Sequence, residues 1–250
     1  MEFTHESDVR RPSRRSRDYF YRFNITGENY MTDTPKGAIL QRDGETYAIV
    51  PRTPVGLVPR ETLEALARVV QKYEIPIVKI TSGQRLALVG MKADVIDDIW
   101  EDLGTDIGRA TELCVHYAQA CPGTAVCRFG VQDSLGMALE LEKMYVGIDL
   151  PAKVKFGVSG CPFCCGESYV RDVGLIGTKK GWHVIFGGNS GGKPRIGDLL
   201  AENLDRDAAI ELVRRALEYY KENGKKRERT ARFMNRIGAT QFKSALGLSD

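Results

Sequence analysis

Six cysteines lie close together in this chain of 250 residues, all of them between Cys114 and Cys165. Most fall in two short motifs. The first runs CPGTAVC from Cys121 to Cys127, and the second runs CPFCC from Cys161 to Cys165. Two loops that each give two thiolates can supply the four ligands of a cubane iron–sulfur cluster. The spacing therefore favours a 4Fe–4S site.

Three other readings of the cysteines stay open on spacing alone. Free cysteines are often small buried hydrophobes. The C-x2-C of the second motif would suit structural zinc, although C-x5-C is a poor zinc knuckle. Disulfides are disfavoured because the first twenty residues lack the apolar stretch of a secretory signal, which predicts a cytoplasmic protein.

The elements expected around the two motifs would hold them rigidly. Strands are predicted at 112–117 and 153–158, each followed by a cysteine loop, with a helix over 133–145 between them. Gly123, Gly160 and Gly166 would let the backbone approach a bulky inorganic core. Further along we expect strands at 169–177 and 182–186, a tight turn at 187–192, a helix at 207–220 that buries Ile210, Val213, Leu217 and Tyr220, and a basic helical tail from Lys225.

The part before the cysteines shows a regular order of elements. Strands are predicted at 37–41, 47–52, 76–81 and 85–89, and helices at 61–73 and 92–103. The first helix would bury Leu63, Leu66, Ala67 and Val70, which recur at helical spacing. The order β-β-α-β-β-α implies a small α+β sandwich with the helices on one face of the sheet.

Residues 1–30 are expected to form a flexible basic extension. The stretch Arg10–Arg17 carries five arginines, and such a run is usually a solvated tail. A twin-arginine export signal is disfavoured because nothing hydrophobic follows Arg14–Arg15. The net charge of +3 is too small to indicate nucleic-acid binding, and no apolar run reaches the length of a membrane span.

Beyond the cysteines, several longer runs resemble the siroheme-dependent nitrite and sulfite reductase family. They are KITSGQRLALVG from Lys79, ACPGTAVCRFGVQDS from Ala120, LPAKVKFGVSGCPFCCGE from Leu150, DVGLIG from Asp172, GWHVIFGGNSGGKPR from Gly181 and ERTARFMNRIG from Glu228. The chain most resembles the small single-unit sulfite reductases of assimilatory type and the siroheme domain of nitrite reductases. The resemblance implies an α+β fold, with a ferredoxin-like half-domain at 31–104 and a domain for siroheme and the 4Fe–4S cluster at 105–250.

The resemblance also assigns roles to particular residues. It implies that Cys121, Cys127, Cys161 and Cys165 bind the cluster, and that Cys165 is also the axial ligand of the siroheme iron, with Cys164 as the alternative. Lys153 and Lys155 match the family's Lys-x-Lys anion site. The family's two arginines fall on Gly83, where Arg85 is the nearest substitute, and on His116. Siroheme carboxylates would bind Asn189, Lys193 and Arg195.

The activity implied is six-electron reduction of sulfite to sulfide, and reduction of nitrite to ammonia is the alternative. A non-catalytic electron-transfer protein and a zinc-stabilised binding module are the rivals from other classes. No nicotinamide or flavin motif is visible, so electrons are expected from an external donor such as a ferredoxin or a reductase subunit. The basic tail could dock an acidic donor. Larger family members contain two copies of this unit, so a homodimer is a further expectation.

Overall fold

The computed structural model describes residues 34–108 and 112–248. Two predictions lie outside these residues: the basic extension at 1–30 and the export-signal alternative at Arg14–Arg15. None of the described helices is both long enough and apolar enough to cross a membrane.

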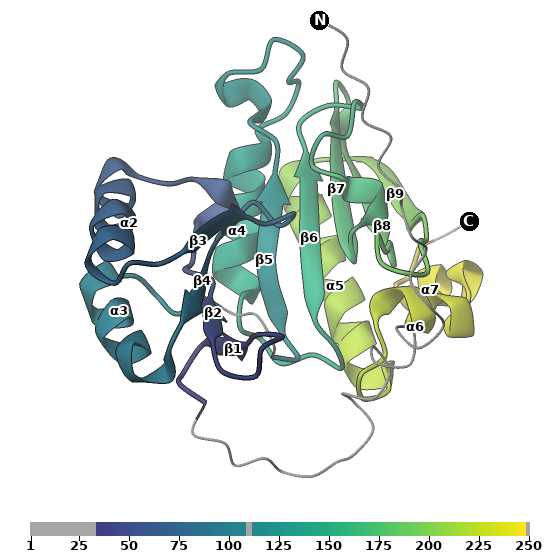
Figure 1. Ribbon diagram of the computed structural model, residues 1–250. Helices are drawn as coiled ribbons and strands as arrows, with labels where there is room; N and C mark the ends of the chain where they lie inside the picture. The colour runs from purple at the N-terminus through teal and green to yellow at the C-terminus, as the bar shows by residue number, and fades with distance from the viewer. Residues whose placement is uncertain (1–33, 109–111, 249–250) are drawn as a thin grey trace, which may run out of the picture. The chain divides into compact units, whose positions relative to one another are not determined.

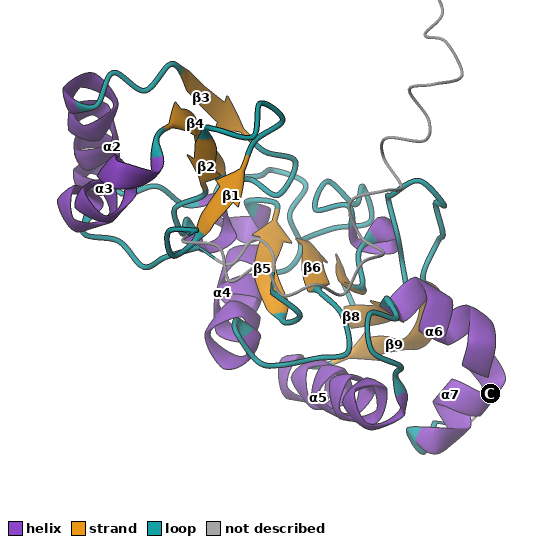
Figure 2. Ribbon diagram, turned by 60° about the horizontal axis from the view of Figure 1, so that its bottom comes forward, coloured by secondary structure: helices purple, strands orange, loops and turns teal. Residues whose placement is uncertain are grey.

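The first part of the described chain is a four-stranded antiparallel sheet with two helices on one face (Figures 1 and 2). The strand order is β1 (Ala38–Leu40), β2 (Tyr47–Ile49), β4 (Leu86–Met91) and β3 (Ile77–Ile80). Helices α2 (Arg60–Lys72) and α3 (Ile96–Leu103) cover it. The predicted β-β-α-β-β-α order is confirmed, although the helix expected from Lys92 begins with a 3₁₀ turn at Ala93–Val95.

The buried face of α2 differs from the predicted one. Leu66 is buried, but Leu63 and Ala67 are exposed, while Ala65 and Val69 pack in the core. Apolar residues occupy much of the circumference of this helix, so two stripes satisfy the same spacing and periodicity alone cannot choose between them.

The second part of the chain contains a five-stranded mixed sheet. Its order is β5 (Val115–Ala120), β6 (Val154–Ser159), β7 (Val173–Thr178), β8 (Gly181–Phe186) and β9 (Asp198–Leu204), of which the first three are parallel. Helices α4 (Ser134–Tyr145) and α5 (Arg206–Asn223) pack on one face, as Figure 2 shows. The short helices α6 (Thr230–Ile237) and α7 (Ala239–Ala245) add aromatic rings to the same core.

Several boundaries differ from those expected. The strand predicted at 112–117 lies three residues later, and the strand predicted from Tyr169 begins at Val173, after a 3₁₀ turn at Ser168–Val170. Strand β9 was not predicted, because only Leu200 along it is buried and the alternation is weak. On α5, Val213, Leu217 and Tyr220 are buried as predicted, whereas Ile210 is only half-buried.

Residues of β6 alternate between the two faces of this sheet. Val154, Phe156 and Val158 enter the helix-covered core, so Lys155 and Gly157 belong to the other face. That second face has no helix of the α4–α5 layer over it. It carries the charged side chains of the site described next.

Candidate functional site

The two cysteine loops leave the same edge of the second sheet. Strand β5 ends at Ala120 and the parallel strand β6 ends at Ser159, so Cys121 and Cys161 follow at neighbouring positions. In Figure 1 the arrowheads of both strands point the same way, and the loop after β5 projects beyond this edge. Parallel pairing is therefore what brings the two motifs together.

A hydrogen bond joins the first loop to the second. The backbone N–H of Gly160 donates to Sγ of Cys121 over 3.1 Å, and the N–H of Cys121 donates to the carbonyl of Val158 over 3.1 Å. Both Cys121 and Cys161 are buried. An N–H donor aimed at a sulfur stabilises a thiolate, which is the form that binds iron.

Glycine at position 160 is required by this contact. A Cβ there would stand 2.7 Å from Cα of Gly123 and 2.8 Å from the carbonyl oxygen of Gln132. Two further hydrogen bonds hold the loops together: the carbonyl of Gly160 accepts from the backbone N–H groups of Val131 and Gln132. The backbones of the two loops are therefore in contact, which is the arrangement expected if both loops bind one cluster.

Cys127, Cys164 and Cys165 lie nearer the surface. Cys127 and Cys164 are half-buried and Cys165 is exposed. Cys164 has a φ of +57°, which places its backbone in the left-handed region. Among the described residues no three His, Cys, Asp or Glu side chains converge on a single metal ion. A cubane core is wider than one ion and accepts thiolates from more separated positions.

A basic pocket of about 260 Å³ opens beside the second loop on the uncovered face of the sheet. Its cations are Lys153, Lys155, Arg171 and Arg229, and Asn189 lines it as well. Burial lowers the pKa of Lys155 to about 8, an effect that the neighbouring cations Arg229 and Lys153 reinforce. The structure therefore brings together three of the residues predicted to bind anions or siroheme carboxylates.

The acidic residue of this pocket, Asp172, is already satisfied. Its carboxylate accepts from the guanidinium of Arg229 at 2.6 Å, from the hydroxyl of Thr230 at 2.6 Å and from the backbone N–H of Lys155 at 3.0 Å. Asp172 offsets the charge of Arg229, and Glu167 offsets that of Arg171, so the charge in excess is that of Lys153 and Lys155. Such a pocket suits a ligand with several negative charges.

Arg171 was not predicted, although it is the most buried cation of the pocket, with 3% of its surface exposed. Its guanidinium donates to Oε1 of Gln119 at 2.6 Å, to the carboxylate of Glu167, to the hydroxyl of Ser190 at 3.4 Å and to the carbonyl of Ser82 at 3.4 Å. Arg171 therefore links β5 and the second cysteine loop to the turns that contain Ser82 and Ser190. Gln119 and Ser82 are distant from Arg171 along the chain, so no local spacing pointed to this residue.

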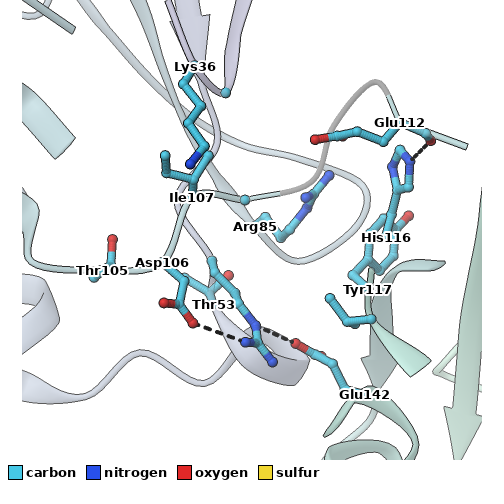
Figure 3. A pocket seen from close by; sticks show the side chains of 14 residues that line it. Lys36, Thr53, Arg85, Thr105, Asp106, Ile107, Glu112, His116, Tyr117 and Glu142 are labelled. Atoms are coloured by element: carbon cyan, nitrogen blue, oxygen red, sulfur yellow. Dashed lines mark hydrogen bonds and ion pairs between the residues drawn. The ribbon is translucent and has the colours of Figure 1, made fainter. Parts of the chain in front are cut away.

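A second pocket, of about 500 Å³, contains Arg85 and His116 (Figure 3). His116 donates its Nε2 proton to the carbonyl of Glu112 over 2.6 Å, as the dashed line shows. Burial lowers the pKa of His116, with further lowering from Lys153 and Arg85. Near neutral pH the ring is therefore uncharged, and its Nδ1 is an acceptor that cannot bind an anion until it is protonated.

Tyr117 lies between these two pockets. Its ring has the guanidinium of Arg85 at 4.8 Å and Nζ of Lys155 at 5.6 Å from its centre. Gly83 lies against the same ring, since a Cβ there would stand 2.5 Å from Cζ of Tyr117. The space of a side chain at 83 is thus filled by Tyr117, which was not among the predicted site residues.

Lys193 and Arg195 do not line either pocket. Arg195 uses its guanidinium within the fold: it donates to Asp198 at 2.6 Å, to Asn235 at 2.8 Å and to the carbonyl of Gly187 at 3.0 Å. Lys193 is exposed, and its carbonyl accepts from the side chain of Asn189 over 2.7 Å. These contacts shape the 187–195 turn, and binding of siroheme carboxylates by either residue stays a prediction.

Two family models match the chain over its described parts. Residues 39–105 match the nitrite/sulfite reductase ferredoxin-like half domain, and residues 113–249 match the nitrite and sulphite reductase 4Fe–4S domain. The chain belongs to the nitrite and sulfite reductase family. The predicted α+β fold, the iron–sulfur cluster with siroheme, and the reductase class are thereby confirmed.

The relatives differ in how much of their length this chain covers. It is 64% identical over 216 residues to an assimilatory-type sulfite reductase of Nitratidesulfovibrio vulgaris, covering 86% of this chain and 99% of that protein. It is 40% identical to a nitrite reductase (NAD(P)H) of Bacillus subtilis, covering 84% of this chain but 26% of that protein. The chain therefore spans about a quarter of that nitrite reductase.

Solved structures share the fold at low identity. The crystal structure of dissimilatory sulfite reductase I matches with a TM-score of 0.73 and 17% identity, over 82% of this chain and 70% of that one. The Mycobacterium tuberculosis NirA protein matches with a TM-score of 0.71 and 18% identity, over 80% of this chain and 39% of that one. At this identity the likeness establishes the arrangement of the elements alone.

Proposed function

We propose that this protein reduces sulfite to sulfide. The observation that carries the proposal is the basic pocket around Lys153, Lys155 and Arg171, on the uncovered sheet face beside the second cysteine loop. The assimilatory-type sulfite reductase noted above supports this substrate, since this chain covers 99% of its length. Nitrite is the second candidate, supported by the 40% identity to a nitrite reductase.

We assign the cluster to Cys121, Cys127, Cys161 and Cys165, with Cys165 also on the siroheme iron. The touching loops and the N–H donor on Cys121 fit this set. When bound, the two cofactors supply an open iron position for the anion and electrons delivered one at a time. Lys153, Lys155 and Asn189 fit the siroheme carboxylates and the substrate, because they line one cationic pocket.

In this proposal the side chains bind the anion and deliver protons. Lys155 lines the basic pocket and attracts the oxygens of the anion, and Arg85, on the same tyrosine ring but in the second pocket, adds its positive charge. A pKa of about 8 lets Lys155 give up a proton near neutral pH, so its Nζ is the best placed general acid for an oxygen that departs as water. His116 joins as a cation only below its lowered pKa.

The wider organisation is part of the proposal. We assign residues 31–104 to the half-domain, 105–250 to the cofactor domain and 1–30 to a basic extension. The donor is an external electron-transfer protein, in keeping with a 28% identical relative named as an assimilatory nitrate reductase electron transfer subunit. Cytoplasmic location and a homodimer complete the proposal, and gel filtration with light scattering measures the latter.

The test is turnover by anaerobically purified holoprotein with reduced methyl viologen. We expect sulfide from sulfite, with a higher kcat/KM for sulfite than for nitrite. Lys155→Met should lower kcat about 100-fold, the loss typical of a missing general acid. A higher kcat/KM for nitrite would favour the second candidate. Absence of turnover of both anions by protein with the full siroheme spectrum would contradict a catalytic role.

A further inference from the structure

Tyr117 connects the two charged pockets through one buried ring. It lies on β5, where its register partner on β6 is Lys155, and only 5% of its surface is exposed. The strand pairing fixes the ring with respect to Lys155. Arg85 reaches the same ring from the turn before β4 of the half-domain.

The ring contacts are suited to holding two cations. The face of an aromatic ring carries negative charge and attracts a guanidinium or an ammonium group. Burial lowers the pKa of both Arg85 and Lys155, so both groups have lost water. An aromatic ring stabilises a desolvated cation without cancelling its charge, whereas a carboxylate would cancel it. The charge of the cation therefore stays available to an anion.

The backbone at Gly83 packs against the ring of Tyr117. Gly83 presses on one edge: a Cβ there would lie 2.5 Å from Cζ and 2.8 Å from the hydroxyl oxygen of Tyr117. The absence of a side chain at 83 is therefore a condition for the ring to stand where it does. The ring, Gly83, Arg85 and Lys155 form one packed unit that spans the half-domain and the sheet.

We propose that Tyr117 is a positioning residue for the anion site. Its ring holds Arg85 and Lys155 at a fixed separation, so that the charge of Arg85, in the second pocket, adds to that of Lys155 in attracting the anion to the basic pocket. The ring performs this role and the hydroxyl is dispensable. This inference rests on the proposed function, because it concerns the residues assigned to substrate binding there.

The experiment compares Tyr117→Leu, which removes the ring, with Tyr117→Phe, which removes only the hydroxyl. We expect Tyr117→Leu to raise KM for sulfite about tenfold and to lower kcat less than Lys155→Met does, and Tyr117→Phe to stay close to wild type. Tyr73→Leu is the matched control, since Nζ of Lys72 lies 5.0 Å from the centre of that half-buried ring, outside both pockets. Its KM should be unchanged.

An equilibrium readout separates this inference from the proposed function. The Kd for sulfite, titrated by the absorption spectrum of the oxidised holoprotein, should rise in Tyr117→Leu by the same factor as KM, whether or not wild type turns over. Gly83→Ala, which pushes the ring aside while residue 117 is kept, should raise Kd likewise and serves if Tyr117→Leu does not fold. An unchanged Kd in either variant, or an equal loss in Tyr117→Phe, would overturn the role of the ring.

Discussion

The backbone N–H of Gly160 donates to Sγ of Cys121 over 3.1 Å, and this bond joins the two cysteine loops directly. It exists because β5 and β6 are parallel and end at the same edge. In each loop a proline directly follows the first cysteine, at Pro122 and Pro162. The geometry at Cys121 and Cys161 is therefore set by the sheet.

Gly160→Ala should separate the loops. The added Cβ would lie 2.7 Å from Cα of Gly123 and 2.8 Å from the carbonyl oxygen of Gln132, and both of these are backbone atoms that cannot give way cheaply. We expect most of the cluster iron to be lost, along with about 1–3 kcal/mol of unfolding free energy from overpacking. Iron content and the absorption of anaerobic protein measure the loss. Gly192→Ala, where a Cβ meets nothing within 4 Å, is the control and should keep its iron.

The choice between Cys164 and Cys165 can be made with two serine variants. Cys165→Ser should remove the siroheme bands and most of the cluster iron, because a single thiolate serves both cofactors in the proposed site. Cys164→Ser should retain both. Absorption spectra and iron-to-protein ratios of the two variants decide it, and the reverse pattern would transfer the ligand role to Cys164.

The activity should fall as pH rises through the pKa of Lys155. That pKa is lowered by burial to about 8, so the ammonium is charged below this pH and neutral above it. We expect kcat/KM for sulfite to decline about tenfold per pH unit above roughly pH 8, since this parameter reports groups of the free enzyme. Lys155→Arg keeps its charge throughout and should flatten this limb. A wild-type profile without a decline between pH 7.5 and 10 would contradict the assignment.

Replacing Arg171 should lower the free energy of unfolding. Its buried guanidinium serves Gln119, Glu167, Ser190 and the carbonyl of Ser82. Arg171→Met would leave these groups without their charged donor and should lower the free energy of unfolding by about 2–3 kcal/mol. Urea unfolding followed by circular dichroism measures this. Arg206→Met, which breaks a half-exposed pair with Glu140, should cost less than 1 kcal/mol or so.

The sequence was informative wherever a residue type dictates local geometry. Proline, glycine and cysteine spacing located both loops, and alternation located β6 with Lys155 on its uncovered face. The α2 face was wrong because two apolar stripes compete on one short helix. Strand β9 escaped because an edge strand with one buried residue has no clear alternation.

The missing site residues share one physical reason. Tyr117, Arg171 and Arg229 act through partners that are distant along the chain: Gly83, Gln119 and Asp172 respectively. No local periodicity encodes such contacts. The charge of His116 could not be predicted from the sequence either, because burial and nearby cations decide whether that imidazole is protonated.

Anomalous diffraction at the iron edge, from crystals of the anaerobically purified holoprotein, tests the shared-cysteine site most directly. We predict a compact four-iron peak bound by Cys121, Cys127, Cys161 and Cys165, and a separate iron peak on the other side of Sγ of Cys165. A single isolated iron or zinc peak, or a cluster whose fourth ligand is Cys164, would contradict it.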